Sequence, residues 1–175
     1  MLQQALDFKA ENDALYELLK PLSDADFERK TLFKDWTIND VMQHLHYFNY
    51  AAHLSLDDED GILKLLADLR AAGEKGEEMV PYTDRMLDGV RGQALLKLWH
   101  DYYENMIGDY AGVDPKKRLK WAGPDMSVLS SVTARLMETW SHAQAIYDVL
   151  GTVRQDRDHI KNVAVIGNNT FGWTF

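Results

Sequence analysis

The sequence contains no cysteine. This absence excludes disulfide bonds, thiolate metal sites and a cysteine nucleophile supplied by the chain itself. The sequence also lacks an apolar run approaching the ~18 residues that a membrane-spanning helix needs. Its first residues, MLQQALDFKAEND, have neither the basic start nor the apolar stretch of a signal peptide. We therefore expect a cytoplasmic protein with no membrane partner.

Positive charge is scarce as well. The chain has 19 Lys and Arg residues against 28 Asp and Glu residues, which gives a formal net charge of −9. Its single basic cluster is too short to form the basic surface that phosphate backbones require. The cluster consists of Lys116, Lys117, Arg118 and Lys120. We therefore expect a small-molecule partner and no nucleic acid.

The 175 residues, 46% of them hydrophobic, are enough for one domain with a real core. Apolar residues recur at helical spacing, and no run alternates as a strand would. The long helices are expected at Leu2–Lys20, Thr37–Leu56, Arg91–Tyr110 and Ser127–Leu150. Shorter helices are expected at 61–72 and 158–167, and the glycines and proline of residues 73–90 predict an irregular connection.

This pattern predicts an all-α fold, a four-helix bundle with a long crossover between the second and third long helices and a short C-terminal helix. Residues 1–151 would form the bundle. Residues 152–175 would form an extension that packs on the bundle or at a dimer interface.

The histidines of the second helix differ in helical phase. His44 lies in the middle of an apolar face, together with Val41, Phe48, Ala51 and Ala52. A buried histidine must be hydrogen-bonded or bound to something, because leaving it unsatisfied costs a few kcal/mol. His44 is therefore either a core histidine bonded to a carboxylate or carbonyl group, or a ligand. The opposite, polar face holds Asn39, His46, Asn49, Tyr50 and His53.

For the remaining histidines we expect structural roles. His46, His53 and His100 are expected to be solvated or interfacial, and His159 to lie at a helix end.

Glu138 and His142 on the fourth helix are one turn apart and can reach a common point, as in helical metal motifs. The alternative is a surface pair that stabilises the helix by a few tenths of a kcal/mol. This helix carries apolar residues on two opposite faces. One face would close the bundle, and the other would meet the tail or a second subunit. Because the tail ends in Phe171, Trp173 and Phe175, we expect a homodimer.

Two segments resemble a known superfamily. Residues 35–45, DWTINDVMQHL, resemble the G-W-T-v-x-D-v-x-x-H-L segment of the DinB/YfiT-like superfamily. Residues 135–144, RLMETWSHAQ, are similar to the R-x-x-E-x-x-x-H-x-x-D segment of the branch that holds the N-terminal domain of mycothiol-dependent maleylpyruvate isomerase. Residues 158–173 resemble the ending of an uncharacterised actinobacterial-type subgroup. The resemblance implies a DinB-like four-helix bundle with a divalent metal on His44, Glu138 and His142.

The sequence departs from this pattern in three places. Asp35 replaces the glycine before the tryptophan, which changes the loop that enters the second helix. The usual H-G-x-D reads His142-Ala143-Gln144-Ala145, so the nearest acid is Asp148 and the surroundings of the ligands differ. We expect no separate C-terminal domain after this segment, and the apolar ending is one that we expect of a truncated product.

Three nitrogen and oxygen ligands would leave coordination positions open, as in reactive sites. Imidazole and carboxylate ligands suit zinc, nickel, iron or manganese, of which zinc is favoured by abundance and nickel comes next. The family resemblance implies a thiol transferase or isomerase that uses a low-molecular-weight thiol of the mycothiol, bacillithiol or glutathione type. A chain without cysteine fits this function.

A metal-dependent hydrolase, with Asp148 or Glu104 as general base, is the first alternative. A non-catalytic metal- or ligand-binding stress protein is the second. Tyr47, Tyr102 and Tyr103 are candidates for lining the pocket or for the core.

Overall fold

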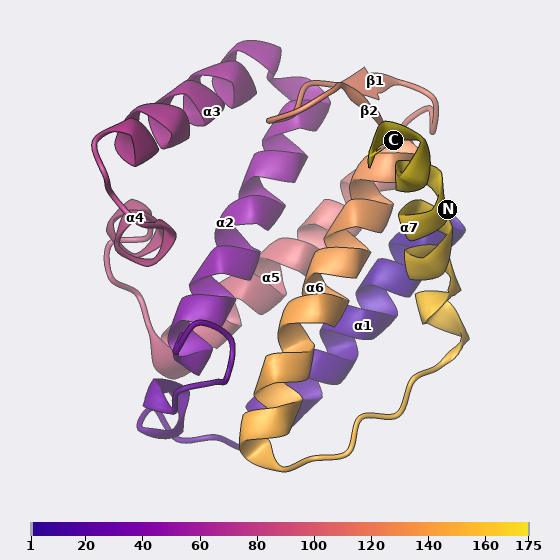
Figure 1. Cartoon of the computed structure of the whole chain (residues 1–175). Helices are drawn as coiled ribbons and strands as arrows, with labels where there is room; N and C mark the ends of the chain where they lie inside the picture. Colours follow the sequence, from indigo (N-terminus) through magenta and orange to yellow (C-terminus); the bar gives the residue numbers. More distant parts are fainter. Residues whose placement is uncertain (1, 175) are drawn as a thin grey trace.

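The computed structural model describes residues 2–174, with side chains described for residues 2–168. The long helices are α1 (Gln3–Leu19), α2 (Ile38–Asp57), α5 (Gly92–Tyr110) and α6 (Val128–Leu150). They form a four-helix bundle in which α1 and α2 each pack against both α5 and α6 (Figure 1). The predicted all-α fold is thus confirmed. Among the described residues, no helix is both long and apolar enough to cross a membrane.

The crossover between α2 and α5 contains two helices, α3 (Glu59–Glu74) and α4 (Met79–Met86), which lie beside α2 (Figure 1). The predicted irregular connection is therefore wrong over α4. Pro81 is the third residue of that helix, where the backbone N–H has no intrahelical acceptor, so the proline ring removes no hydrogen bond. We call α3 and α4 together the arm. A separate apolar cluster holds the arm against α2, and it consists of Tyr47, Ala51, Ile62, Leu65, Ala72 and Tyr82.

A capping box begins α2. The Thr37 hydroxyl accepts a hydrogen bond from the Asp40 backbone N–H at 3.1 Å, and the Thr37 N–H donates to the Asp40 carboxylate at 2.8 Å. The loop before it has two residues with positive φ, Lys34 (53°) and Asp35 (58°). Asp35 thus adopts the left-handed conformation favoured by the glycine that it replaces. The cap and the loop fix the phase of α2.

The face of α2 opposite His44 is mostly buried, with Tyr50 42% exposed, and of the two roles expected for His46, solvated or interfacial, the structure shows the interfacial one. Asn39 and Asn49 are fully buried, and His46 is 5% exposed. The packing of α5 explains this burial, because the Asn39 side chain accepts from the Gly92 backbone N–H at 2.7 Å. Its amide group donates to Glu28 in the short 3₁₀ helix η1 (Asp26–Glu28). Polar residues on this face join helices together.

A two-residue antiparallel ladder lies between α5 and α6. Strand β1 (Arg118–Leu119) pairs with β2 (Met126–Ser127), with Leu119 opposite Met126. Strands this short leave no alternation in the sequence, so the prediction of no strand is corrected at this point alone. Trp121 lies in the loop that joins the two strands.

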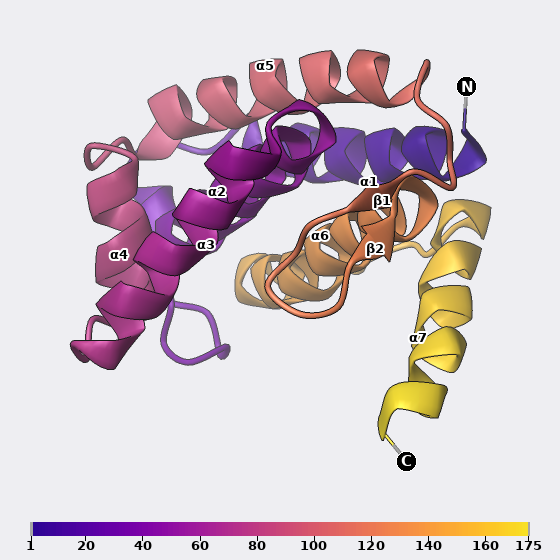
Figure 2. The same ribbon diagram turned by 90° about the horizontal axis from the view of Figure 1, so that it is seen from above.

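The C-terminal extension begins after Gly151, whose φ of 67° ends α6 in a left-handed C-cap. It contains η2 (Asp158–Ile160) and α7 (Lys161–Thr174). Figure 2 shows α7 at the edge of the bundle, near the start of α1. The Asn162 amide accordingly donates to Asp7 at 2.6 Å.

One buried carboxylate ties the extension to the bundle. Glu11 of α1, 3% exposed, forms an ion pair with Arg154 and accepts from His159 Nε2 at 2.7 Å. The side chains of Phe171, Trp173 and Phe175, on which the expectation of a dimer depends, lie outside the described residues. The division into a bundle and an extension stays a prediction.

Candidate metal centre

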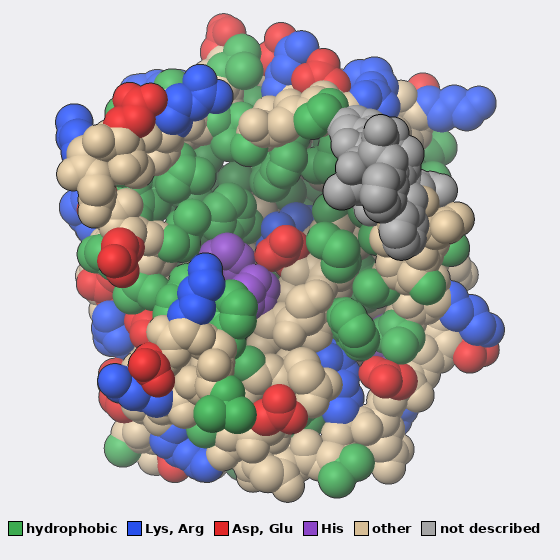
Figure 3. Space-filling view, viewed as in Figure 1, with side chains coloured by type: hydrophobic (Ala, Val, Ile, Leu, Met, Phe, Trp, Pro, Cys, Tyr) green, Lys and Arg blue, Asp and Glu red, His purple; other side chains and the backbone are tan. Residues whose placement is uncertain are grey.

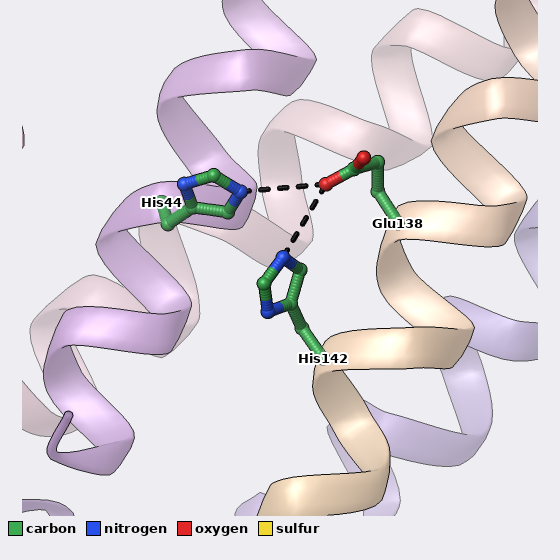
Figure 4. A group of neighbouring side chains, drawn as sticks. All are labelled: His44, Glu138 and His142. Atoms are coloured by element: carbon green, nitrogen blue, oxygen red, sulfur yellow. Dashed lines mark hydrogen bonds and ion pairs between the residues drawn. The ribbon is translucent and has the colours of Figure 1, made fainter. Parts of the chain in front are cut away.

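His44 of α2 and the Glu138/His142 pair of α6 face one another across the two helices (Figure 4). Glu138 Oε2 is 3.4 Å from His44 Nε2 and 3.4 Å from His142 Nε2. One ligand atom from each side chain lies within 4.8 Å of the others. Among the described residues, no other group of three histidines or carboxylates meets this closely. The structure therefore brings together the three residues that the sequence singled out.

Local structure places each of these side chains. The capping box starts α2 at Ile38 and thereby turns His44 toward α6. Ser127 caps α6, with its hydroxyl accepting from the Ser130 N–H at 3.0 Å. The four-residue spacing on α6 then puts Glu138 and His142 on one face of that helix.

The electrostatics keep the cluster in a form that can bind a cation. Hydrogen bonds from His142 and His44, with a contribution from the charge of Arg135, hold the pKa of Glu138 far below its usual range. Burial lowers the pKa of His44. At neutral pH the carboxylate is therefore ionised and the His44 imidazole is neutral, and these are the forms that coordinate metals.

The two spacings around Glu138 are compatible with ligand atoms that share one metal ion. Charge-assisted N–H···O bonds are typically about 2.7–2.9 Å long. Two ligand atoms of a tetrahedral ion with bonds of about 2.0–2.1 Å are about 3.3–3.4 Å apart. Both measured distances to Glu138, at 3.4 Å, match the second arrangement. Two imidazoles and one carboxylate form a donor set that suits zinc or nickel.

Aromatic rings enclose the two imidazoles. Measured between ring centroids, Trp36 lies 5.5 Å from His44 and is parallel to His142 at 6.2 Å. The Phe33 ring meets the His142 ring edge-on with centroids 5.1 Å apart, and the Phe48 and His44 centroids are 4.7 Å apart. His44 Nδ1 is buried without a hydrogen-bond partner among the described residues. Packing and the contact of Nε2 with Glu138 therefore orient this ring, without a hydrogen bond at Nδ1.

The site is open on one side. Figure 3 shows histidine and acidic side chains in a hollow bordered by hydrophobic side chains. The Glu138 side chain is 32% exposed, against 12% for His44 and 15% for His142. The sequence did not predict that Phe33 and Trp121 belong to these surroundings. The centroid of the Trp121 ring is 6.4 Å from that of Phe48. Trp36 was visible only as a residue of the family motif.

The other candidates are engaged elsewhere. Glu104 pairs with Lys9, and Asp148 accepts from Gln144 at 2.9 Å. The Tyr47 hydroxyl meets that of Tyr82 at 2.9 Å, inside the cluster that holds the arm.

The two other tyrosines also have partners outside the centre. Tyr103 donates to Asp13 at 2.9 Å, and the Tyr102 hydroxyl lies 3.0 Å from His53 Nδ1. These contacts give the tyrosines structural roles.

Comparisons with known proteins identify the family of the chain. Residues 8–147 match the family model described as the mycothiol maleylpyruvate isomerase N-terminal domain. Two uncharacterised proteins of Mycobacterium tuberculosis, from strains CDC 1551 / Oshkosh and ATCC 25618 / H37Rv, are each 30% identical to this chain over 169 residues. The match covers 97% of this chain and 65% of each relative, so the chain spans about two thirds of their length.

No solved structure matches the chain significantly. The family match covers most of the bundle, including all three residues of the centre. The chain belongs to the mycothiol maleylpyruvate isomerase N-terminal domain family of the DinB-like superfamily.

Proposed function

We propose that this protein binds a divalent metal, zinc or nickel, through His44, Glu138 and His142, and uses it to transfer or isomerise a small substrate with a low-molecular-weight thiol. The observation that carries this proposal is the convergence of three ligand atoms within 4.8 Å, two pairs of them 3.4 Å apart, beside a hollow. Structural zinc sites instead close all four positions, usually with sulfur.

The thiol part follows from the family and from the composition. When bound, the metal would favour the thiolate form of a thiol whose free pKa is about 8.5. Because the chain has no cysteine, the sulfur must belong to a cosubstrate. The family's description supports mycothiol, and thiols of the bacillithiol or glutathione type are the other members of the class.

The chain's own residues would bind and shield the reactants. The rings of Phe33, Trp36 and Phe48 keep water from the sides of the two imidazoles, since they pack directly on them. The exposed edge of Glu138 marks the side from which a thiol and an electrophile would enter. Trp121, from the β1–β2 loop, borders the same region through Phe48.

The metal is tested first. Wild-type protein loaded with zinc or nickel and then desalted should retain about one equivalent by elemental analysis, and His142→Ala should lose it. His100→Ala is the matched control, because His100 packs on Tyr16 of α1, away from the three ligands. Wild-type protein that retains no metal would contradict the proposal.

Thiol chemistry is tested separately. Conjugation of a generic electrophile with mycothiol, bacillithiol or glutathione should be faster with loaded wild-type protein than with His44→Ala. Equal rates would contradict metal-activated thiol chemistry. Turnover of ester or amide substrates alone would then favour the hydrolase alternative, and retained metal without turnover would favour a binding or stress protein.

The expected homodimer is tested by light scattering. A chain of 20.1 kDa should give about twice that mass at micromolar concentration if two copies associate. A value near that of one chain would instead favour an extension that covers its own bundle, as the contacts of Glu11 and Asp7 suggest.

A further inference from the structure

Arg135 is a buried cation one turn before Glu138 on α6. The residue is 3% exposed, and its Nε donates to the Asn49 side-chain oxygen at 3.0 Å. Its Nη2 atom is buried without a hydrogen-bond partner among the described residues, and the same holds for the Asn49 amide nitrogen. Burial lowers the pKa of Arg135 to about 10, so the guanidinium stays charged at neutral pH.

No carboxylate lies within ion-pair distance of Arg135 among the residues whose side chains are described. The acidic group whose charge acts on it is Glu138, which is also the carboxylate shared by His44 and His142. A buried charge without a paired counterion is costly. Asn49, its hydrogen-bonded partner, is neutral and offers no compensation.

A bound divalent ion would deepen this imbalance. Both the ion and Arg135 would depend on the single negative charge of Glu138, since the imidazoles that coordinate an ion are neutral. The loaded centre would then hold two uncompensated positive charges in a half-buried place. In such surroundings an interaction with an anion is stronger than in water.

We propose that Arg135 is a positioning residue whose buried charge makes the loaded centre select small anionic ligands, such as thiolates, over neutral ligands of similar size. This inference rests on the proposed metal centre. Arg135 acts through the electrostatic potential at the open side of the centre and through Glu138. The same charge opposes the divalent ion, so the centre binds the ion more weakly than its three ligands alone would.

The test uses full-length protein loaded with cobalt(II), followed by its visible absorption. Thiocyanate serves as the anionic probe and imidazole as the neutral one. Arg135→Met should weaken thiocyanate binding about tenfold, the size expected of one unit charge acting over about 12 Å at an effective dielectric constant of about 20. Imidazole binding should stay unchanged. Cobalt binding should become about tenfold tighter, even if the variant is less stable.

Three further variants separate charge from structure. Asn49→Asp keeps the shape of the contact with Arg135 and adds a compensating charge, so it should shift both affinities in the same directions as Arg135→Met. This variant decides the question if Arg135→Met does not fold. Arg135→Lys should retain selectivity for the anion. Arg85→Met on α4, which removes a surface charge paired with Glu77, should change neither affinity.

The outcomes are distinct. Loss of affinity for thiocyanate and imidazole alike, or no change with either charge-altering variant, would refute the role of Arg135 while leaving the metal centre intact. Wild-type protein that binds no cobalt would refute the metal centre itself, and this inference with it.

Discussion

Replacing Glu11 by glutamine should destabilise the protein strongly, because Glu11 is the buried counter-charge of the extension. Glu11 is 3% exposed, and the Arg154 side chain is 7% exposed. Besides this carboxylate, the Arg154 guanidinium donates to the Trp140 carbonyl and packs over the rings of Trp140 and Tyr147. Glutamine would leave that buried cation with the exposed Asp156 carboxylate, 3.5 Å from Arg154 Nε, as its remaining counter-charge, and would turn an N–H group toward Arg154 or His159.

Breaking a buried ion pair from one side costs about 3–5 kcal/mol. For a domain of this size each kcal/mol lowers Tm by roughly 2–4 °C, so we expect Glu11→Gln to melt about 6–20 °C below wild type. Glu17→Gln on the same helix is the matched control. The Glu17 side chain is 67% exposed and pairs loosely with Lys20, so its loss should change stability by less than about 0.5 kcal/mol.

Two measurements make this reasoning refutable. Urea unfolding gives the free energy, and limited trypsin digestion reports whether Arg154 has become accessible. Glu11→Gln/Arg154→Met should be no less stable than Glu11→Gln alone, because the second change removes the stranded charge. A loss below about 1 kcal/mol, with wild-type resistance to trypsin, would show that the Glu11 cluster does not hold the extension.

Two further changes probe α2. Thr37→Ala removes the hydroxyl that caps the helix and should lower the free energy of unfolding by about 1 kcal/mol, measured in urea with Thr152→Ala as the control. His46 gives a pH dependence. Burial lowers its pKa in the folded protein to about 4, whereas the unfolded chain takes up the proton near the ordinary value of 6.5. Stability present above pH 6.5 should therefore be lost between pH 6.5 and 4, by about 3 kcal/mol. His46→Phe, which keeps the edge-on contact with Tyr102, should flatten this part of the profile of unfolding free energy against pH, and an unchanged slope would contradict the assignment.

The candidate centre could be predicted from the sequence because two local rules placed its residues. Helical phase separated His44 from the other histidines of its helix, and the four-residue spacing paired Glu138 with His142. That the three side chains meet across α2 and α6 depends on tertiary packing. Helical phase and spacing do not predict this meeting, and it was expected from the family resemblance. Phe33 and Trp121 could not be found in this way, because they come from loops whose paths no periodicity describes.

The same phase rule said less about the other face of α2. It marks that face as polar and left its histidines either solvated or interfacial, and the structure shows that Asn39, His46 and Asn49 are buried. The arm, α5 and α6 cover most of α2, and asparagine side chains there bond to α5 and α6. The prediction missed α4 for a related reason. Proline was read as a helix breaker, although in the first turn it costs no hydrogen bond.

The position of the centre has a consequence for the lifetime of the protein. His44 and Glu138 are 94 residues apart in sequence, and a cation held between them would fasten α2 to α6 as a cross-link. An ion that binds only the folded state adds stability with the logarithm of its free concentration, about 4 kcal/mol at a thousand times its Kd. The melting temperature would therefore report how much ion is free in solution. In a cell that degrades unfolded chains, the abundance of this protein would follow the supply of its ion.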